Sequence, residues 1–230
     1  MNPLDVSVII PIFNAKKWIE TSVQVIEEQF RNLSCRYEIL LRDDGSSDES
    51  RSVLEFLAKR NPAVRCFYND RNRGLGYTLR KLLPEAGGER IVYLDIDLPF
   101  SAGTISKVLD ELSRCDVVVV SRYLRKGVDV PLLRQWTSRL YFQMCRVLFA
   151  NAIQDIGSGM VGMKKGVADL DLEADGFDFH IEFLVEARRR GFSICEMGAQ
   201  YLSSGQHSFH IFKHGPRVVL DTFRLWWKKR

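Results

Sequence analysis

The sequence has few cysteines and lacks the patterns that mark several large classes of protein. Its five cysteines stand singly, without a CxxC pair, and an odd number cannot close completely into intrachain disulfides, so we expect a reducing compartment. No uninterrupted apolar stretch approaches the roughly 20 residues that a membrane-spanning helix needs. Asp5 precedes the first apolar run, where a signal peptide would carry basic residues. These absences predict a cytoplasmic protein that can still touch the surface of a membrane.

Two nucleotide-binding signatures and a strong charge bias are absent as well. The chain has neither the Walker lysine motif nor GxGxxG, so P-loop and Rossmann dinucleotide sites lack support. A formal net charge of +4 is too small to indicate a nucleic-acid partner. The hydrophobic fraction of 46% and the charged fraction of 27% are ordinary for a globular chain and exclude extensive disorder, so function must come from local sites.

What the chain does contain is an alternation of short apolar runs and longer segments of helical period. The five runs are residues 6–13, 37–42, 64–68, 91–97 and 116–122, and their apolar character is typical of parallel strands covered on both faces. The segments between them suit crossover helices, with Ser47 and Ser101 as N-caps.

The pattern changes after residue 123. There follow a long segment at 131–151, a glycine-rich stretch at 155–165, a helix near 178–190, a strand at 192–199 and a terminal amphipathic segment. We predict one α/β domain over residues 1–230, with an open, mostly parallel twisted sheet, helices on both faces and a C-terminal amphipathic helix. Ligands should bind beyond the carboxyl ends of the strands.

Polar loops follow three of the predicted strands, in "PIFNA", "RDDGSSDES" and "DIDLPF". Alternate side chains of a strand point the same way, so Asp95 and Asp97 would present two carboxylates to one point beyond the strand. Mg²⁺ or Mn²⁺ favours such oxygen ligands together with substrate phosphates. The alternative is a strand that simply stops at a solvated loop. The two glycines of "NRGLGYTL" either bring backbone donors near a ligand or only form a turn.

The ordered set "SVIIPIFN", "EILLRDDGSSD", "RGLG" and "YLDIDL" resembles the family-two glycosyltransferases with the GT-A fold. Within that family, "RGLGYTL", "VVVVSRY" and "GFDFHIEFLVEARRRGFSICEM" are similar to the dolichol-phosphate mannose synthase branch, whose members move a sugar from a nucleotide sugar to a polyprenyl phosphate. The resemblance implies that residues 1–123 bind the nucleotide sugar, of the GDP-mannose or UDP-glucose type. It also implies that residues 124–230 bind the acceptor and the membrane surface.

The resemblance also assigns residues to roles. It implies a nucleotide-sugar site formed by Pro11, Phe13, Asn14, Arg42, Asp44, Gly74, Asp95, Ile96, Asp97 and Arg122. Asp95 and Asp97 would hold Mg²⁺ or Mn²⁺ on the diphosphate, with Asp95 either a second ligand or a contact to ribose and metal-bound water. Arg122 would help neutralise the diphosphate, and Arg134 and Ser138 would bind the acceptor phosphate. Asp97, Arg122, Arg134 and Ser138 form the implied catalytic set.

The C-terminal part carries a histidine series, His207, His210 and His214. One of the first two could complete the metal site that Asp95 and Asp97 begin, and the alternatives are ordinary polar loop roles or a separate zinc site. We include His207 among the candidate metal ligands.

Two segments could meet lipid. Residues 134–150 and 216–230 each combine an apolar helical face with basic residues, a pattern that suits an anionic membrane interface, and the alternative is that both helices pack on the core.

Three hypotheses follow for the function. The first is a metal-dependent, inverting transfer of a hexose to a polyprenyl phosphate at the cytosolic face of a membrane. The second keeps the donor and transfers to a hydroxyl of a glycan or small molecule, with Asp178 or Glu182 as the base unless Glu182 only pairs with Arg188 or Arg189. The third is a non-catalytic nucleotide-sugar-binding subunit, because Ala15, Val161 and the loop at 201–212 depart from the family pattern.

Overall fold

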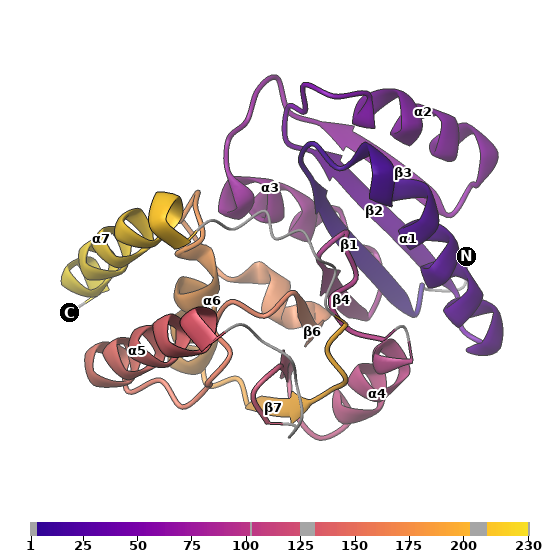
Figure 1. The fold of residues 1–230 in the computed structure, drawn as a ribbon. Helices are drawn as coiled ribbons and strands as arrows, with labels where there is room; N and C mark the ends of the chain where they lie inside the picture. Colours follow the sequence, from indigo (N-terminus) through magenta and orange to yellow (C-terminus); the bar gives the residue numbers. More distant parts are fainter. Residues whose placement is uncertain (1–3, 102, 125–131, 203–210, 230) are drawn as a thin grey trace.

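The computed structural model describes residues 4–101, 103–124, 132–202 and 211–229, and it is a three-layer α/β arrangement (Figure 1). The seven strands of its sheet are β1 (Val6–Ile12), β2 (Tyr37–Asp43), β3 (Val64–Tyr68), β4 (Arg90–Leu94), β5 (Val117–Ser121), β6 (Met160–Lys164) and β7 (Ile194–Gly198). Their order across the sheet is β3-β2-β1-β4-β6-β5-β7. Only β6 runs antiparallel to its neighbours, so the predicted mostly parallel sheet is confirmed.

Helices cover both faces of the sheet. They are α1 (Lys16–Asn32), α2 (Ser50–Arg60), α3 (Leu75–Leu82), α4 (Thr104–Glu111), α5 (Leu132–Phe149), α6 (Phe179–Arg189) and α7 (Ile211–Lys229), with short 3₁₀ turns η1 (Leu83–Glu85) and η2 (Lys165–Asp169). Apolar residues of α1, α2 and α4 form one core with one face of the sheet, and those of α3 and α6 form a second core with the other face. The two layers of helices bury the near-continuous apolar runs of β1, β2 and β5 on both sides.

The second core also receives the two long C-terminal helices. Cys145 of α5 and Leu225 of α7 are buried in it, and the Tyr141 hydroxyl lies 2.9 Å from the Thr222 hydroxyl where α5 and α7 meet. Both helices lie on the same side of the molecule, away from α1 and α2 (Figure 1). The predicted C-terminal amphipathic helix is therefore present, although Pro216 lies inside it.

Three details of the predicted fold are wrong. The glycine-rich stretch at 155–165 contains β6, which inserts between β4 and β5, because its small residues fit against α4: a Cβ added to Gly162 would lie 2.2 Å from a methyl of Val108. The strand predicted at 91–97 ends at Leu94, since the chain turns at 95–98, where the Leu98 N–H donates to the Asp95 carbonyl over 3.1 Å.

The third detail is the pair of helix caps. α2 begins three residues after Ser47, whose hydroxyl donates to the Asn14 amide oxygen and accepts no N–H of the helix as a cap. α4 begins at Thr104, and it is the Ser101 carbonyl that accepts the Thr104 N–H. Serine is a frequent cap, but here the Ser47 hydroxyl bonds to a distant loop and the Ser101 hydroxyl lies 3.2 Å from the Thr104 hydroxyl.

Candidate functional site

The polar loops meet at one edge of the sheet. β2, β1 and β4 are neighbours, so the loops at 13–15, 43–49 and 95–100 leave adjacent strand ends. Because β6 is antiparallel, the segment 155–159 that precedes it reaches the same edge from the opposite chain direction. This edge is the place where an open α/β sheet binds ligands.

The first two loops are locked together by side-chain hydrogen bonds. The Asn14 amide oxygen accepts the N–H groups of Ser47 (2.8 Å) and Asp48 (3.4 Å), and Asn14 itself has a positive φ of 49°. In return the Asp48 carboxylate accepts the Lys16 N–H at 3.1 Å, which satisfies one free donor at the start of α1. Pro11 is half-buried at the end of β1, and Phe13 is 49% exposed beside this junction. Phe13 is therefore open to a ligand such as a nucleobase.

Asp44 is buried and organises the "RGLG" loop. One of its carboxylate oxygens accepts the Asn69 amide and the Arg73 N–H, each at 2.8 Å, and the other accepts the Gly74 N–H at 2.9 Å. The Asn69 amide oxygen in turn accepts from the Arg42 guanidinium at 3.0 Å. Asp44 and Arg42 thus lie in one network behind the loop, and their contacts with a nucleotide stay predictions.

A second segment, residues 173–176, holds the "RGLG" loop from the other side. The Asp175 carbonyl accepts the N–H groups of Gly76 and Tyr77, and a Cβ added to Gly74 would lie 2.4 Å from that same oxygen. Gly74 has a φ of 99°, a conformation that glycine adopts without strain. Position 74 therefore requires glycine for two reasons: its backbone has a positive φ, and a side chain would collide with segment 173–176.

Glu182 of α6 fixes the segment 173–176, so neither alternative that the sequence left for it, a catalytic base or a partner of Arg188 or Arg189, describes its contacts. Its buried carboxylate accepts the N–H groups of Glu173 (2.9 Å) and Ala174 (2.8 Å) and lies 3.8 Å from the Lys229 ammonium of α7. A carboxylate with these donors stabilises structure, so Glu182 is a poor candidate for a catalytic base.

Asp95 and Asp97 lie in the turn that follows β4. The Tyr93 hydroxyl donates to Asp95 Oδ1, and the Asp95 N–H donates to the Gly159 carbonyl at 2.9 Å. The carbonyl of Ile96, between the two aspartates, accepts the Ser22 hydroxyl of α1. The turn is therefore tied to β4, to the segment just before β6 and to α1 at once.

The donor set of this turn fits a divalent cation. Two carboxylates one residue apart are hard oxygen ligands, and Mg²⁺ or Mn²⁺ is commonly held by one or two carboxylates plus substrate phosphates. Within the described ranges no three His, Cys, Asp or Glu side chains cluster as a metal site. In this turn Asp95 and Asp97 are the side chains that could hold the ion, with the other positions left for phosphate and water.

Arg122 forms a buried ion pair beside this turn. Its Nε donates to Asp155 Oδ2 at 2.8 Å, a second guanidinium nitrogen donates to Oδ1, and the Arg122 N–H also donates to Oδ2 at 2.9 Å. Burial alone would lower the pKa of the guanidinium, but the Asp155 carboxylate outweighs it and the pKa is raised. The charge of Arg122 is already balanced within the protein, and its contact with a diphosphate stays a prediction.

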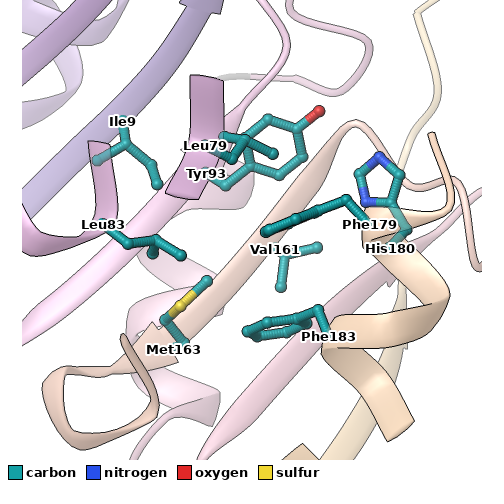
Figure 2. A pocket seen from close by; sticks show the side chains of 9 residues that line it. All are labelled: Ile9, Leu79, Leu83, Tyr93, Val161, Met163, Phe179, His180 and Phe183. Carbon is teal, nitrogen blue, oxygen red and sulfur yellow. The ribbon is translucent and has the colours of Figure 1, made fainter. Parts of the chain in front are cut away.

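His180 of α6 is buried next to Tyr93 and lines a small apolar cavity (Figure 2). The cavity measures about 20 Å³ and is lined by Ile9, Leu79, Leu83, Tyr93, Val161, Met163, Phe179, His180 and Phe183. Burial lowers the pKa of His180 to about 4, so the imidazole is neutral at pH 7. A cavity of this size holds at most about one water molecule. This cavity is therefore too small to hold a nucleotide sugar, and the open edge stays the predicted ligand site.

The predicted acceptor residues lie on α5. Ser138 is half-buried in that helix, and Arg134 belongs to the same helix with its side chain outside the described part. His207 and His210 fall in 203–210, outside the described residues, and the side chain of His214 is also outside them. The roles of all five residues stay predictions.

Sequence reasoning missed three residues that shape this edge, Asn69, Tyr93 and Gly159, and it missed the backbone contacts of Glu182. Only Tyr93 carried a usable signal, because it stands two residues before Asp95 and so shares its side of the strand. The others act through partners at least eight residues away, and no local pattern reveals such partners.

Comparisons with known proteins agree with this geometry. A family model described as glycosyl transferase family 2 matches residues 7–170, which include every loop described above up to Gly159. The glycosyltransferase AglD of Haloferax volcanii is 24% identical over 98% of this chain and 37% of its own length. A dolichol-phosphate mannosyltransferase of Pyrococcus furiosus is 27% identical over 80% of this chain and 53% of its own length. This chain thus spans about a third to a half of these relatives.

Solved structures identify the fold. Glucosyl-3-phosphoglycerate synthase from Mycobacterium tuberculosis, in complex with Mn²⁺, uridine diphosphate and glucosyl-3-phosphoglycerate, superposes with a TM-score of 0.73 at 18% identity, over 97% of this chain and 80% of that one. The α/β sheet with its antiparallel β6 is therefore a GT-A fold. With the family match covering more than half of the chain and its loops gathered at one sheet edge, this protein belongs to glycosyl transferase family 2.

Proposed function

We propose that this protein is an inverting glycosyltransferase that moves a hexose from a GDP- or UDP-sugar to a polyprenyl phosphate at a membrane surface. The observation that carries the proposal is the Asp95–Asp97 turn, tied to three parts of the chain at the edge where the family's loops meet. The names of the relatives from Haloferax volcanii and Pyrococcus furiosus support glycosyl transfer, and the name of the second also supports a lipid phosphate acceptor.

The proposed reaction needs few groups from the protein. An acceptor phosphate oxygen attacks the anomeric carbon, and the bond to the nucleoside diphosphate oxygen breaks with its electron pair staying on the diphosphate. A divalent ion held by Asp95 and Asp97 would stabilise that growing negative charge. The phosphate is already anionic, so it requires cationic guides such as Arg134 and no base. Residues 1–123 would serve the donor, and residues 124–230 the acceptor and the membrane.

Exposed apolar stripes on α5 and α7 support the membrane location. Trp136, Leu140 and Val147 of α5 are exposed and fall on one helical face, as do Leu220, Phe223 and Trp227 of α7. Exposed basic residues flank both stripes, namely Arg139, Arg146, Arg217, Arg224 and Lys228. Such a surface complements the apolar boundary and the negative charge of an anionic bilayer. No helix in the described part of the chain is long and apolar enough to span a membrane.

The test is turnover with a panel of donors and acceptors. Purified protein is incubated with Mg²⁺ or Mn²⁺, GDP- and UDP-hexoses, and either a polyprenyl phosphate or hydroxyl acceptors. We expect lipid-linked sugar, and in the Asp97→Ala variant a fall in turnover of about 100-fold or more, as when one electrostatic stabiliser is removed. Asp110→Ala, which removes an exposed carboxylate of α4, should keep wild-type turnover.

Other outcomes separate the alternatives. Sugar transfer to a hydroxyl acceptor and none to the lipid would favour the second hypothesis, with Asp178 as its base, since burial raises the pKa of that carboxylate. Metal-dependent binding of a nucleotide sugar without any turnover would favour a non-catalytic subunit.

A further inference from the structure

We propose that Tyr93 is a positioning residue that, together with Gly159, holds the Asp95 carboxylate in the orientation that binds the divalent ion. The inference rests on the proposed function. It adds an explanation of how Asp95, as a ligand of the ion, is held in its orientation. Its first observation is the hydrogen bond from the Tyr93 hydroxyl to Asp95 Oδ1. Tyr93 is buried in β4, two residues before the carboxylate that it contacts.

The ring of Tyr93 has little freedom to move. It packs in the core between the sheet and α6, and the centroid of the His180 ring lies 5.8 Å from its own. Figure 2 shows the Tyr93 hydroxyl pointing away from Leu83 and Met163, on the side of the ring opposite the apolar cavity. A buried phenol requires a hydrogen-bond partner, and Asp95 supplies it.

Gly159 holds the other side of the same carboxylate. A Cβ added to Gly159 would lie only 2.5 Å from Asp95 Oδ2, so the oxygen packs directly against the glycine backbone. The Gly159 carbonyl also accepts the Asp95 N–H at 2.9 Å. One oxygen of Asp95 is therefore set by a hydrogen bond and the other by close packing, before any ion binds.

This arrangement has a defined effect on the binding of a cation. A carboxylate oxygen has two lone pairs, so Oδ1 can accept from Tyr93 and still coordinate an ion. Outer partners that orient metal ligands typically change metal affinity 10–100-fold when they are removed.

The experiment measures Mn²⁺ binding directly. Free Mn²⁺ is quantified by its electron paramagnetic resonance signal while each protein is titrated in the presence of saturating UDP or GDP. We expect Tyr93→Phe, which keeps the ring and removes the hydroxyl, to bind Mn²⁺ about 10–100-fold more weakly than wild type. Turnover of this variant should recover as Mn²⁺ is raised. Tyr37→Phe, which removes a phenol at the opposite edge of the sheet, is the matched control and should bind as wild type does.

A second variant keeps the test sharp if Tyr93→Phe folds poorly. Gly159→Ala should displace Asp95 Oδ2 and weaken Mn²⁺ binding, whereas Gly157→Ala in the same segment adds a methyl to open space and should not. Wild-type affinity in a folded Tyr93→Phe, or failing that in Gly159→Ala, would overturn this inference alone. Absence of Mn²⁺ binding by the wild-type protein with both nucleotides would overturn the metal dependence of the proposed function as well.

Discussion

Buried polar side chains shape the site more than exposed ones do. Asp44, Arg122, Asp155 and Glu182 are all buried, and each of them bonds to backbone or to a side chain of another loop. Burying a charge costs several kcal/mol unless partners surround it. Here hydrogen bonds and ion pairs offset this cost. The same bonds hold the loops at an open edge of the sheet, where few apolar contacts are available.

His180 gives a residue-scale prediction about pH. The pKa of His180 is about 4 in the folded protein and about 6.5 when unfolded, so between these values only the unfolded chain takes up the proton. The stabilising contribution of the neutral imidazole is therefore fully present above pH 6.5 and is lost as the pH falls towards 4. Its size is about 3 kcal/mol.

Urea unfolding of wild type and His180→Phe from pH 4 to pH 7.5 checks this expectation. Wild type should lose about 3 kcal/mol more unfolding free energy over this range than the variant, which has no group to titrate there. Parallel pH profiles of the two proteins would contradict it.

At the scale of elements, the start of α3 depends on two segments far apart in the sequence. Asp44 holds the Arg73 and Gly74 N–H groups, and the Asp175 carbonyl holds those of Gly76 and Tyr77. The segment 173–176 is in turn bonded to Glu182 of α6. The conformation of the "RGLG" loop is thereby coupled to the packing of α6.

Gly74→Ala tests this junction. The substitution forces a side chain into a φ of 99° and against the Asp175 carbonyl, so we expect the unfolding free energy to fall by roughly 1–3 kcal/mol and nucleotide binding to weaken. The control is Gly166→Ala, where an added Cβ meets nothing within 4 Å and stability should stay within about 0.5 kcal/mol of wild type. Equal losses of unfolding free energy in Gly74→Ala and Gly166→Ala would show that the junction does not require glycine at position 74.

At the scale of the whole molecule, the two cores differ in what they leave exposed. The core beneath α1, α2 and α4 lies on one face of the sheet, whereas α5 and α7 contribute Cys145 and Leu225 to the core on the other face and leave apolar stripes outside. The exposed fractions of Trp136, Leu140 and Trp227 are 69%, 75% and 76%. Large exposed apolar side chains gathered on neighbouring helices indicate an interaction surface.

Sedimentation with lipid vesicles tests whether that surface is a membrane interface. We expect binding to anionic vesicles that weakens with added salt, and little binding to neutral vesicles. The double variant Trp136→Ser with Trp227→Ser should bind anionic vesicles at least about tenfold more weakly, because burial of each large apolar side chain contributes about 1.5–3 kcal/mol. Phe56→Ser changes an exposed aromatic residue of α2 and should bind normally. Unchanged binding of the double variant would argue against this surface.

The sequence by itself determined the α/β class, the parallel strands β1 to β5 and the family, because each depends on residues that are neighbours in the chain. The periodicity of apolar residues, the turn residues and the four motifs are local patterns, and they can be recognised in the sequence without knowledge of the fold. They also predicted that Asp44, Asp95 and Asp97 lie at one edge of the sheet, where the structure has them.

Only the tertiary structure decided how those residues are held. The insertion of β6 between β4 and β5 brings Gly159 against Asp95, and Arg122 meets Asp155 across 33 residues of sequence. Pairings of this kind depend on strand register and on the packing of distant segments, which no short motif encodes. The same physical reason explains why β6, hidden in a glycine-rich stretch, and the backbone contacts of Glu182 could not be predicted from the sequence.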